Sequence, residues 1–234
     1  MISNIQELHE HVLTCYPMEA VGIVKDTIFY PKNNTHPEPV NNFSLSKEDS
    51  LEVSLAKASV IHSHTYVRFN DDPRTPTYED MQGRERTQTP WGIVHTDGKT
   101  VSDILWFGGI NTGDLIGRYY ISNVFDCFTL ARDFLYITYG IDVGIHPRPG
   151  NWQDWNPYYI ERTWSKLNFS SVNGNLQYGD IVLFTIGTNY INHIGVYIGD
   201  DRFIHHLYQR NSIIDSFSKW NKQFKKAIRY NYGE

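Results

Sequence analysis

A glycine- and asparagine-rich run near the middle of the chain, residues 108–113, limits most strongly how the 234 residues can fold. Glycine and asparagine favour turn conformations that interrupt helices and strands, so the run marks a boundary. A chain of this length suits one large domain or two modest ones. We therefore predict two domains, residues 1–111 and 112–234.

The predicted first domain alternates helical and strand-like patterns. Helical spacing of apolar residues covers 4–15, and helix-start residues begin two further predicted helices, 46–57 and 77–86. Strand-like patterns cover 20–24, 27–30, 59–64, 91–95 and 103–107. Elements that alternate in this way favour a mixed α/β fold, in which helices cover a sheet.

The predicted second domain begins with helices and ends with strands. Helices are predicted over 127–139 and 158–167, and strands over 181–186, 193–198, 202–205 and 227–232. Helices followed by consecutive strands indicate an α+β domain with an antiparallel sheet.

Composition excludes several classes of function. A net charge of −5 without a basic patch gives no electrostatic support for nucleic-acid binding. The sequence contains no run of about 18 apolar residues, so no membrane span is predicted, and the N-terminus shows no signal-peptide pattern. The two cysteines, Cys15 and Cys127, fall in different predicted domains, so no disulfide framework is expected. We expect synthesis in a reducing cytoplasm.

Cys127 opens a predicted helix, a position that suits a nucleophile. A thiol attacks as thiolate, and the unpaired amides of a helix start are expected to lower the pKa of Cys127. A histidine must then take the proton, and a third polar group must orient that histidine. His193, at the start of a predicted strand, is the candidate base.

The third group depends on the turn that follows His193. If residues 199–201 all form the loop, Gly195 lies opposite His205, which then shares a face with His193. If only two residues turn, the register moves by one and His206 takes that face. The alternative is that the thiol and the histidines are ordinary buried residues.

Four segments of the second half resemble the NlpC/P60 cysteine peptidases. They are Phe125-Asp126-Cys127-Phe128-Thr129-Leu130, Gly179-Asp180-Ile181-Val182, His193-Ile194-Gly195-Val196-Tyr197-Ile198-Gly199 and Phe203-Ile204-His205-His206. The resemblance implies a papain-like α+β fold with Cys127 as nucleophile, His193 as base and His205, twelve residues later, as the orienting residue. It also implies a peptidoglycan substrate, usually the bond from D-glutamate to diaminopimelate.

The first half carries a candidate metal site. His62 and His64 lie two residues apart on a predicted strand and therefore face the same side. Asp80, on the next predicted helix, completes three protein ligands, and water in the fourth position would make a catalytic zinc site. We expect Glu19 to take the proton of that water and Thr77 to offer its hydroxyl to the developing oxyanion.

The order Glu, His-Ser-His, Pro-Thr-x-x-Asp resembles the motif of the JAMM (MPN-type) metalloproteases. The resemblance implies a Zn2+ ion and a metallopeptidase fold. Thr77 stands where the family has serine, and Thr65 stands where it usually has proline. The segment from His64 to Thr77 is also several residues longer than in the family. These departures leave open a site that binds metal without turnover.

The two motifs in this order resemble tail assembly proteins of long-tailed bacteriophages, of the lambda tail protein K type. The likeness includes Pro147-Arg148-Pro149-x-x-Trp152 and His205-His206-Leu207-Tyr208-Gln209-Arg210. It implies a virion protein of the tail tip, with other tail-tip proteins as partners. It also implies a peptidoglycan endopeptidase acting in tail assembly and host entry. The alternatives are a non-catalytic hub protein and a zinc-dependent maturation protease of tail proteins.

Overall fold

The computed structural model describes residues 2–66, 72–149 and 156–231. The chain divides into two compact units, Met1–Gly109 and Ile110–Glu234, which places the division two residues before the predicted boundary. Trp152, part of one of the phage-like segments, lies outside the described residues. Among the described residues, no helix is long and apolar enough to cross a bilayer.

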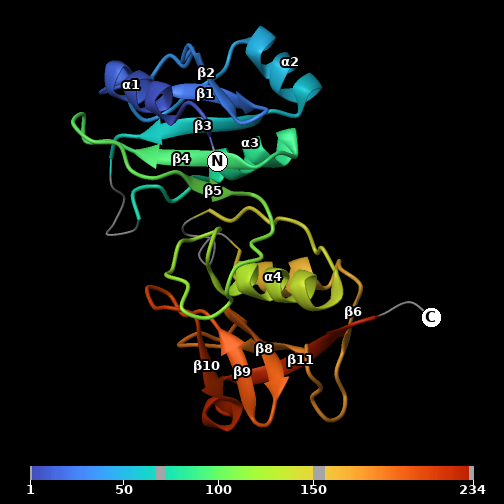
Figure 1. The fold of residues 1–234 in the computed structure, drawn as a ribbon. Helices are drawn as coiled ribbons and strands as arrows, with labels where there is room; N and C mark the ends of the chain where they lie inside the picture. Colours follow the sequence, from blue (N-terminus) through green and yellow to red (C-terminus); the bar gives the residue numbers. More distant parts are fainter. Residues whose placement is uncertain (1, 67–71, 150–155, 232–234) are drawn as a thin grey trace. The chain divides into compact units, whose positions relative to one another are not determined.

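The first unit is a five-stranded mixed sheet with three helices, coloured blue to green in Figure 1. The sheet order is β2-β1-β3-β4-β5. The strands are β1 (Val21–Lys25), β2 (Ile28–Lys32), β3 (Ser59–His64), β4 (Trp91–His95) and β5 (Leu105–Phe107). The helices are α1 (Ile5–Cys15), α2 (Lys47–Ala56) and α3 (Tyr78–Thr87).

Strand β3 lies in the middle of this sheet and is buried over most of its length. It runs antiparallel to β1 and parallel to β4, with α3 as the crossover between the parallel strands. Ile61 joins Leu8 and Val12 of α1 in one apolar core. Successive side chains of a strand point to opposite faces, so His62 and His64 lie on the face away from that core.

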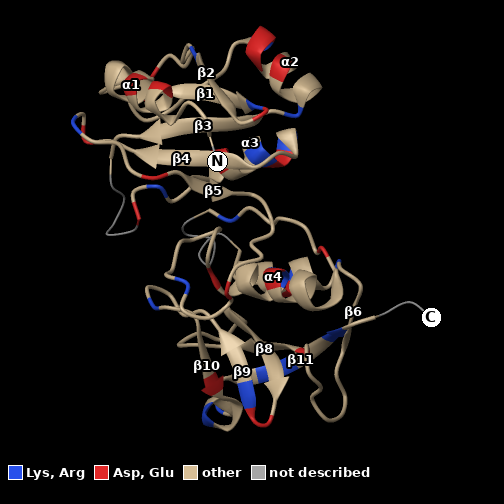
Figure 2. Ribbon diagram, viewed as in Figure 1, with Lys and Arg blue, Asp and Glu red and all other residues tan. Residues whose placement is uncertain are grey.

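Ion pairs of Lys25 in β1 and Lys32 in β2 hold α2 against these strands, and the acidic residues of α2 are red in Figure 2. Lys32 of β2 contacts the carboxylates of Asp49 and Glu52, each at 2.7 Å.

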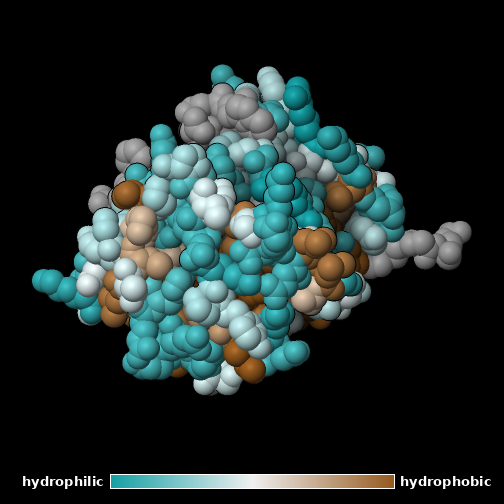
Figure 3. All heavy atoms as spheres, turned by 90° about the horizontal axis from the view of Figure 1, so that it is seen from above, coloured by the Kyte–Doolittle hydropathy of each residue, from teal (hydrophilic) through white to brown (hydrophobic). Residues whose placement is uncertain are grey.

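On the face shown in Figure 3, apolar side chains form several separate groups among hydrophilic ones. The surface visible there therefore offers no single continuous apolar patch.

The second unit is a six-stranded antiparallel sheet in the order β10-β9-β8-β7-β11-β6. The strands are β6 (Phe169–Ser171), β7 (Ile181–Phe184), β8 (His193–Gly199), β9 (Arg202–His205), β10 (Ile213–Ser216) and β11 (Phe224–Tyr230). The helices among its described residues are α4 (Cys127–Tyr139), α6 (Tyr159–Trp164) and the 3-10 helix η1 (Phe217–Trp220). The sequence patterns did not predict β6, β10 or η1, and β11 begins three residues before its predicted start.

Both faces of this sheet are covered. Ile194, Val196 and Ile204 pack with α4 in one apolar core. On the other face, Phe184 and Phe203 form a second core, against which η1 packs. These two layers set the positions of the residues at the start of α4 and at the start of β8.

The β8–β9 hairpin combines features of both registers considered from the sequence. Gly199 pairs with Arg202, so only Asp200 and Asp201 form the turn, and both have positive φ as a tight hairpin turn requires. The register then shifts between Tyr197 and Gly199, which makes Ile198 an inserted bulge residue. This bulge restores Gly195 opposite His205.

Gly195 allows β8 and β9 to approach closely. A Cβ atom there would lie 2.6 Å from Phe203 Cδ2 and 3.0 Å from the backbone oxygen of Ile204. The aromatic ring can shift, but the backbone oxygen is held by the sheet. We predict that Gly195→Ala lowers the free energy of unfolding of the second unit by about 1–3 kcal/mol, measured by thermal or denaturant unfolding.

Gly174→Ala is the matched control, because a Cβ at this exposed position would meet no atom within 4 Å. Equal stability of the two variants would contradict the close approach of the strands.

Candidate functional site

The thiol site starts from the capping of α4. Asp126 precedes the helix, and its Oδ1 accepts hydrogen bonds from the backbone amides of Phe128 and Thr129, both at 3.0 Å. Thr129 Oγ1 accepts in return from the amide of Asp126 at 2.9 Å, which completes a capping box. Cys127, partly buried, is thereby fixed as the first residue of the helix.

A buried arginine neutralises the capping carboxylate. Arg148 forms an ion pair with Asp126, and both side chains are almost fully buried. Asn123 links the same segments, because its side-chain amide donates to the carbonyl of Arg148 at 2.8 Å. Breaking one partner of such a pair leaves an uncompensated buried charge. The segment that contains Arg148 was recognised as phage-like from the sequence, but its ion pair with Asp126 was not predicted.

The expected lowering of the Cys127 pKa was wrong. Burial, with the adjacent Asp126 carboxylate, raises the pKa of Cys127 to about 12. Arg148 and the backbone amides of Ile194 and Phe128 act in the opposite direction but are outweighed. The thiol is therefore protonated at neutral pH, and the charge of Asp126 opposes the effect of the backbone amides at the helix start.

His193 and His205 form a buried imidazole pair. His193 Nε2 and His205 Nδ1 are 3.0 Å apart. Burial, aided by the imidazoles of His205 and His206, holds the pKa of His193 well below its usual range, and burial lowers the pKa of His205 to about 4. Both rings are therefore neutral at pH 7. The structure pairs His193 with His205, and His206 instead lies edge-on to Tyr120, with ring centroids 5.5 Å apart.

The thiol and the imidazole pair meet at the start of β8. The backbone amide that binds the Cys127 sulfur belongs to Ile194, the residue after His193. Because Nε2 of His193 is engaged by His205, Nδ1 is the nitrogen suited to accept the thiol proton. Cys127 and His193 are thus brought together as neighbours through the backbone.

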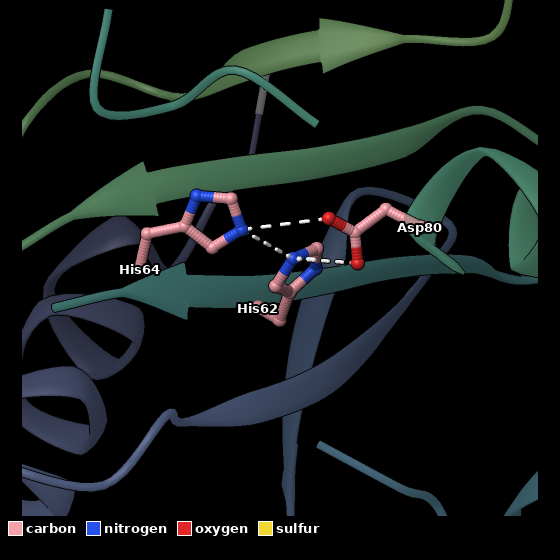
Figure 4. Close-up of side chains that lie close together, drawn as sticks. All are labelled: His62, His64 and Asp80. Carbon is pink, nitrogen blue, oxygen red and sulfur yellow. Dashed lines mark hydrogen bonds and ion pairs between the residues drawn. The ribbon is translucent and has the colours of Figure 1, made fainter. Parts of the chain in front are cut away.

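In the first unit, three predicted ligands converge (Figure 4). His62 Nε2 lies 3.2 Å from His64 Nε2 and 3.2 Å from Asp80 Oδ1, and His64 Nε2 lies 3.5 Å from Asp80 Oδ2. All three side chains are buried. Two imidazole nitrogens and one carboxylate oxygen, grouped within 4.8 Å, form a donor set suited to zinc.

Neighbouring groups orient these ligands. His64 Nδ1 lies 2.9 Å from the carbonyl oxygen of Pro73, which favours a proton on Nδ1 and a free Nε2. The ring of Phe43 stacks on His62 with centroids 4.4 Å apart. Burial alone would raise the pKa of Asp80, but the two imidazoles lower it well below its usual range, so this carboxylate is ionised.

Thr77 and Glu19 lie beside this cluster. Thr77 is the residue that caps α3, and its Oγ1 accepts from the amide of Asp80 at 3.0 Å while its own amide donates to Asp80 Oδ2 at 2.8 Å. Glu19 is buried, and its charge acts on His64. Its neighbour Ala20 donates its amide to Ser63 Oγ at 2.9 Å, which holds this segment against β3.

Comparison with known proteins places the second half in a family. The sequence pattern of the NlpC/P60 family matches residues 106–229. Over 237 aligned residues, the chain is 26% identical to tail tip assembly protein K of Escherichia phage N15, covering 97% of this chain and 94% of the relative. Tail tip assembly protein K of Escherichia phage lambda is 27% identical over 118 residues, which cover 50% of this chain and 59% of the relative.

A shorter match links the chain to a bacterial enzyme. Murein DD-endopeptidase MepS/murein LD-carboxypeptidase of Escherichia coli K12 is 39% identical over 57 residues, which cover 24% of this chain and 30% of the relative. The family match extends over more than half of the chain and includes Cys127, His193 and His205. The chain belongs to the NlpC/P60 family.

Proposed function

We propose that this protein is a phage tail-tip component whose second unit cleaves a peptide amide of bacterial peptidoglycan. The observation that carries the proposal is the neutral His193–His205 pair beside Cys127, within a chain that belongs to the NlpC/P60 family. The likeness to tail tip assembly protein K over 97% of the chain supports the tail location. The local likeness to a murein endopeptidase supports the substrate class.

The resting charges define the order of proton transfers. His193 Nδ1 removes the proton of the Cys127 thiol as the sulfur attacks the amide carbonyl, and a carbon–sulfur bond forms. The imidazolium then gives this proton to the leaving amine, and the carbon–nitrogen bond breaks. Water, activated by the same nitrogen, hydrolyses the thioester and restores the thiol. His205 holds His193 in the orientation that these transfers require.

Removal of the nucleophile tests the reaction. Cys127→Ala should abolish release of soluble muropeptides from purified sacculi, because no other step forms the thioester. Cys15→Ala is the matched control, since Cys15 lies in the first unit, and it should keep full activity. Chelation by EDTA should also leave the release unchanged.

Undiminished release by Cys127→Ala would contradict the proposed reaction. A non-catalytic hub role is the alternative in that case, and normal assembly and infection by virions that carry the same substitution would favour it.

The raised pKa of Cys127 has a measurable consequence. In a Cys15→Ser background, the rate of alkylation by iodoacetamide should rise about ten-fold per pH unit between pH 7 and 9, because the thiolate fraction grows with pH far below the pKa. Asp126→Asn should react faster at each pH, because the carboxylate raises the pKa of Cys127 and its loss lowers it. Asn can still cap the helix. A rate that is independent of pH in this range would indicate a thiolate at rest and contradict the prediction.

For the first unit, we propose a Zn2+ site of the JAMM/MPN type held by His62, His64 and Asp80. The convergence of three buried donor atoms supports it. A bound zinc ion would supply a Lewis acid and an acidified water. Glu19 is the proposed proton acceptor, and Thr77 is proposed to orient Asp80 and to offer its hydroxyl to an oxyanion. Cleavage of another tail protein during maturation is the second candidate function, which this cluster favours.

Measuring the zinc content of variants distinguishes the proposed ligands from nearby residues that do not bind the ion. After dialysis, the wild-type protein should retain about one zinc per chain, and Asp80→Asn or His62→Ala should lose most of it. The asparagine can still accept the amide of Thr77, so α3 should keep its start. Glu19→Gln should retain zinc, as should the control His9→Ala on α1. Equal zinc in wild type and Asp80→Asn would contradict the proposed site.

A further inference from the structure

Trp220 covers the imidazole pair. This half-buried side chain ends η1, and its ring centroid lies 4.8 Å from that of His205 and 5.9 Å from that of His193. The ring planes of Trp220 and His205 are almost perpendicular, at 82°, whereas Trp220 and His193 are tilted by only 30°. No other part of the proposed mechanism uses this indole.

Two carboxylates hold Trp220 in place. Its Nε1–H donates to Asp215 Oδ2 at 3.0 Å. Asp201, in the turn of the β8–β9 hairpin, accepts hydrogen bonds from the hydroxyls of Ser216 and Ser218 at 2.7 and 2.8 Å. It also accepts from the backbone amide of Ser218 at 2.8 Å. Hydrogen bonds therefore connect η1 and its flanking residues both to β10, through Asp215, and to the turn of the β8–β9 hairpin, through Asp201.

His205 has a nitrogen that needs an explanation. Its Nδ1 lies 3.0 Å from His193 Nε2, but its buried Nε2 has no hydrogen-bond partner among the described residues. A buried N–H without an acceptor is costly. An N–H that points at the face of an aromatic ring gains a weak hydrogen bond, and a perpendicular arrangement of rings permits this geometry.

We propose that Trp220 is a positioning residue that fixes the tautomer of His205 by accepting its Nε2–H on the indole face. With the proton on Nε2, Nδ1 of His205 is an acceptor and takes the Nε2–H of His193. The Nδ1 of His193 is then unprotonated and ready to accept the thiol proton. The indole thereby selects, through two rings, the nitrogen that acts as the base.

The surroundings keep this chain of rings neutral. The groups that influence His193 are the imidazoles of His205 and His206, and those that influence His205 are Asp215 and His206. The carboxylate of Asp215 favours a charged His205, but burial outweighs it and lowers the pKa of His205 to about 4. At pH 7, both rings therefore carry one proton each, so their tautomers are defined.

The inference rests on the proposed function only for its catalytic consequence, so the test has two readouts. Nitrogen NMR of the full-length protein with 15N-labelled histidines reports which ring nitrogen carries the proton, without substrate. Wild-type His205, assigned by the loss of its signals in His205→Gln, should be protonated on Nε2. Trp220→Leu should give a mixture of the two tautomers, and Trp220→Phe, which keeps an aromatic face, should restore most of the wild-type pattern.

The second readout is muropeptide release from sacculi. Trp220→Leu should lower kcat at least ten-fold with little change in KM, because a base in the wrong tautomer loses part of the about 10²- to 10⁴-fold that proton transfer contributes. Phe217→Leu is the matched control, because Phe217 lies on the same segment and packs against Phe203, 6.1 Å away, rather than against His205. This control should keep the wild-type tautomer and rate.

The two proposals fail in different ways. Wild-type His205 protonated on Nδ1, or Trp220→Leu with an unchanged tautomer, would overturn the role of the indole whatever the activity. Absent muropeptide release by the wild type, with the expected tautomers, would overturn the proposed substrate and leave the role of Trp220 supported. If Trp220→Leu does not fold, the wild-type protein decides: a proton on Nε2 of His205 supports the role of the indole, and a proton on Nδ1 overturns it.

Discussion

The buried contact between Asp126 and Arg148 is the interaction on which the thiol site depends. Asp126 caps α4, accepts a hydrogen bond from the backbone amide of Asn123 and lies next to the sulfur. One carboxylate therefore fixes the position of Cys127 and adds to the effect of burial in raising its pKa. Without Arg148, this charge would be uncompensated in a dry environment, and the helix start would be destabilised. Burial and the Asp126 carboxylate together keep the thiol protonated at rest, and Arg148 only partly opposes them.

The first unit also has a carboxylate in a capping box at the start of a helix. Asp80 completes a capping box with Thr77 at the start of α3, and the same side chain converges with His62 and His64 of β3. In each unit, the helix start therefore carries a carboxylate with two tasks. Because Asp80 Oδ2 accepts the backbone amide of Thr77, the capping box fixes the carboxylate next to the two imidazoles.

Motif spacing predicted the residues that converge in each unit, because strand alternation and helix starts are local features. Periodicity placed His62 and His64 on one face, and it placed Cys127 at a helix start. The pKa of Cys127 was not predictable, since burial and the ion pair with Arg148 arise only from contacts distant in sequence. Trp220 was missed for the same reason, because η1 is short and Trp220 contacts residues of three strands, β7, β8 and β9.

The bulge at Ile198 means that the number of residues between His193 and His205 decides whether the two side chains lie on the same face of the sheet. Two imidazoles can meet on one side of a pleated sheet only when the residues between them, turn and bulge included, add up to the correct alternation. Loss or gain of one residue in this hairpin would turn His205 away and present His206, unless a compensating change accompanied it. Insertions or deletions in this segment must therefore come in twos to keep His205 facing His193, whatever side chains occupy the turn.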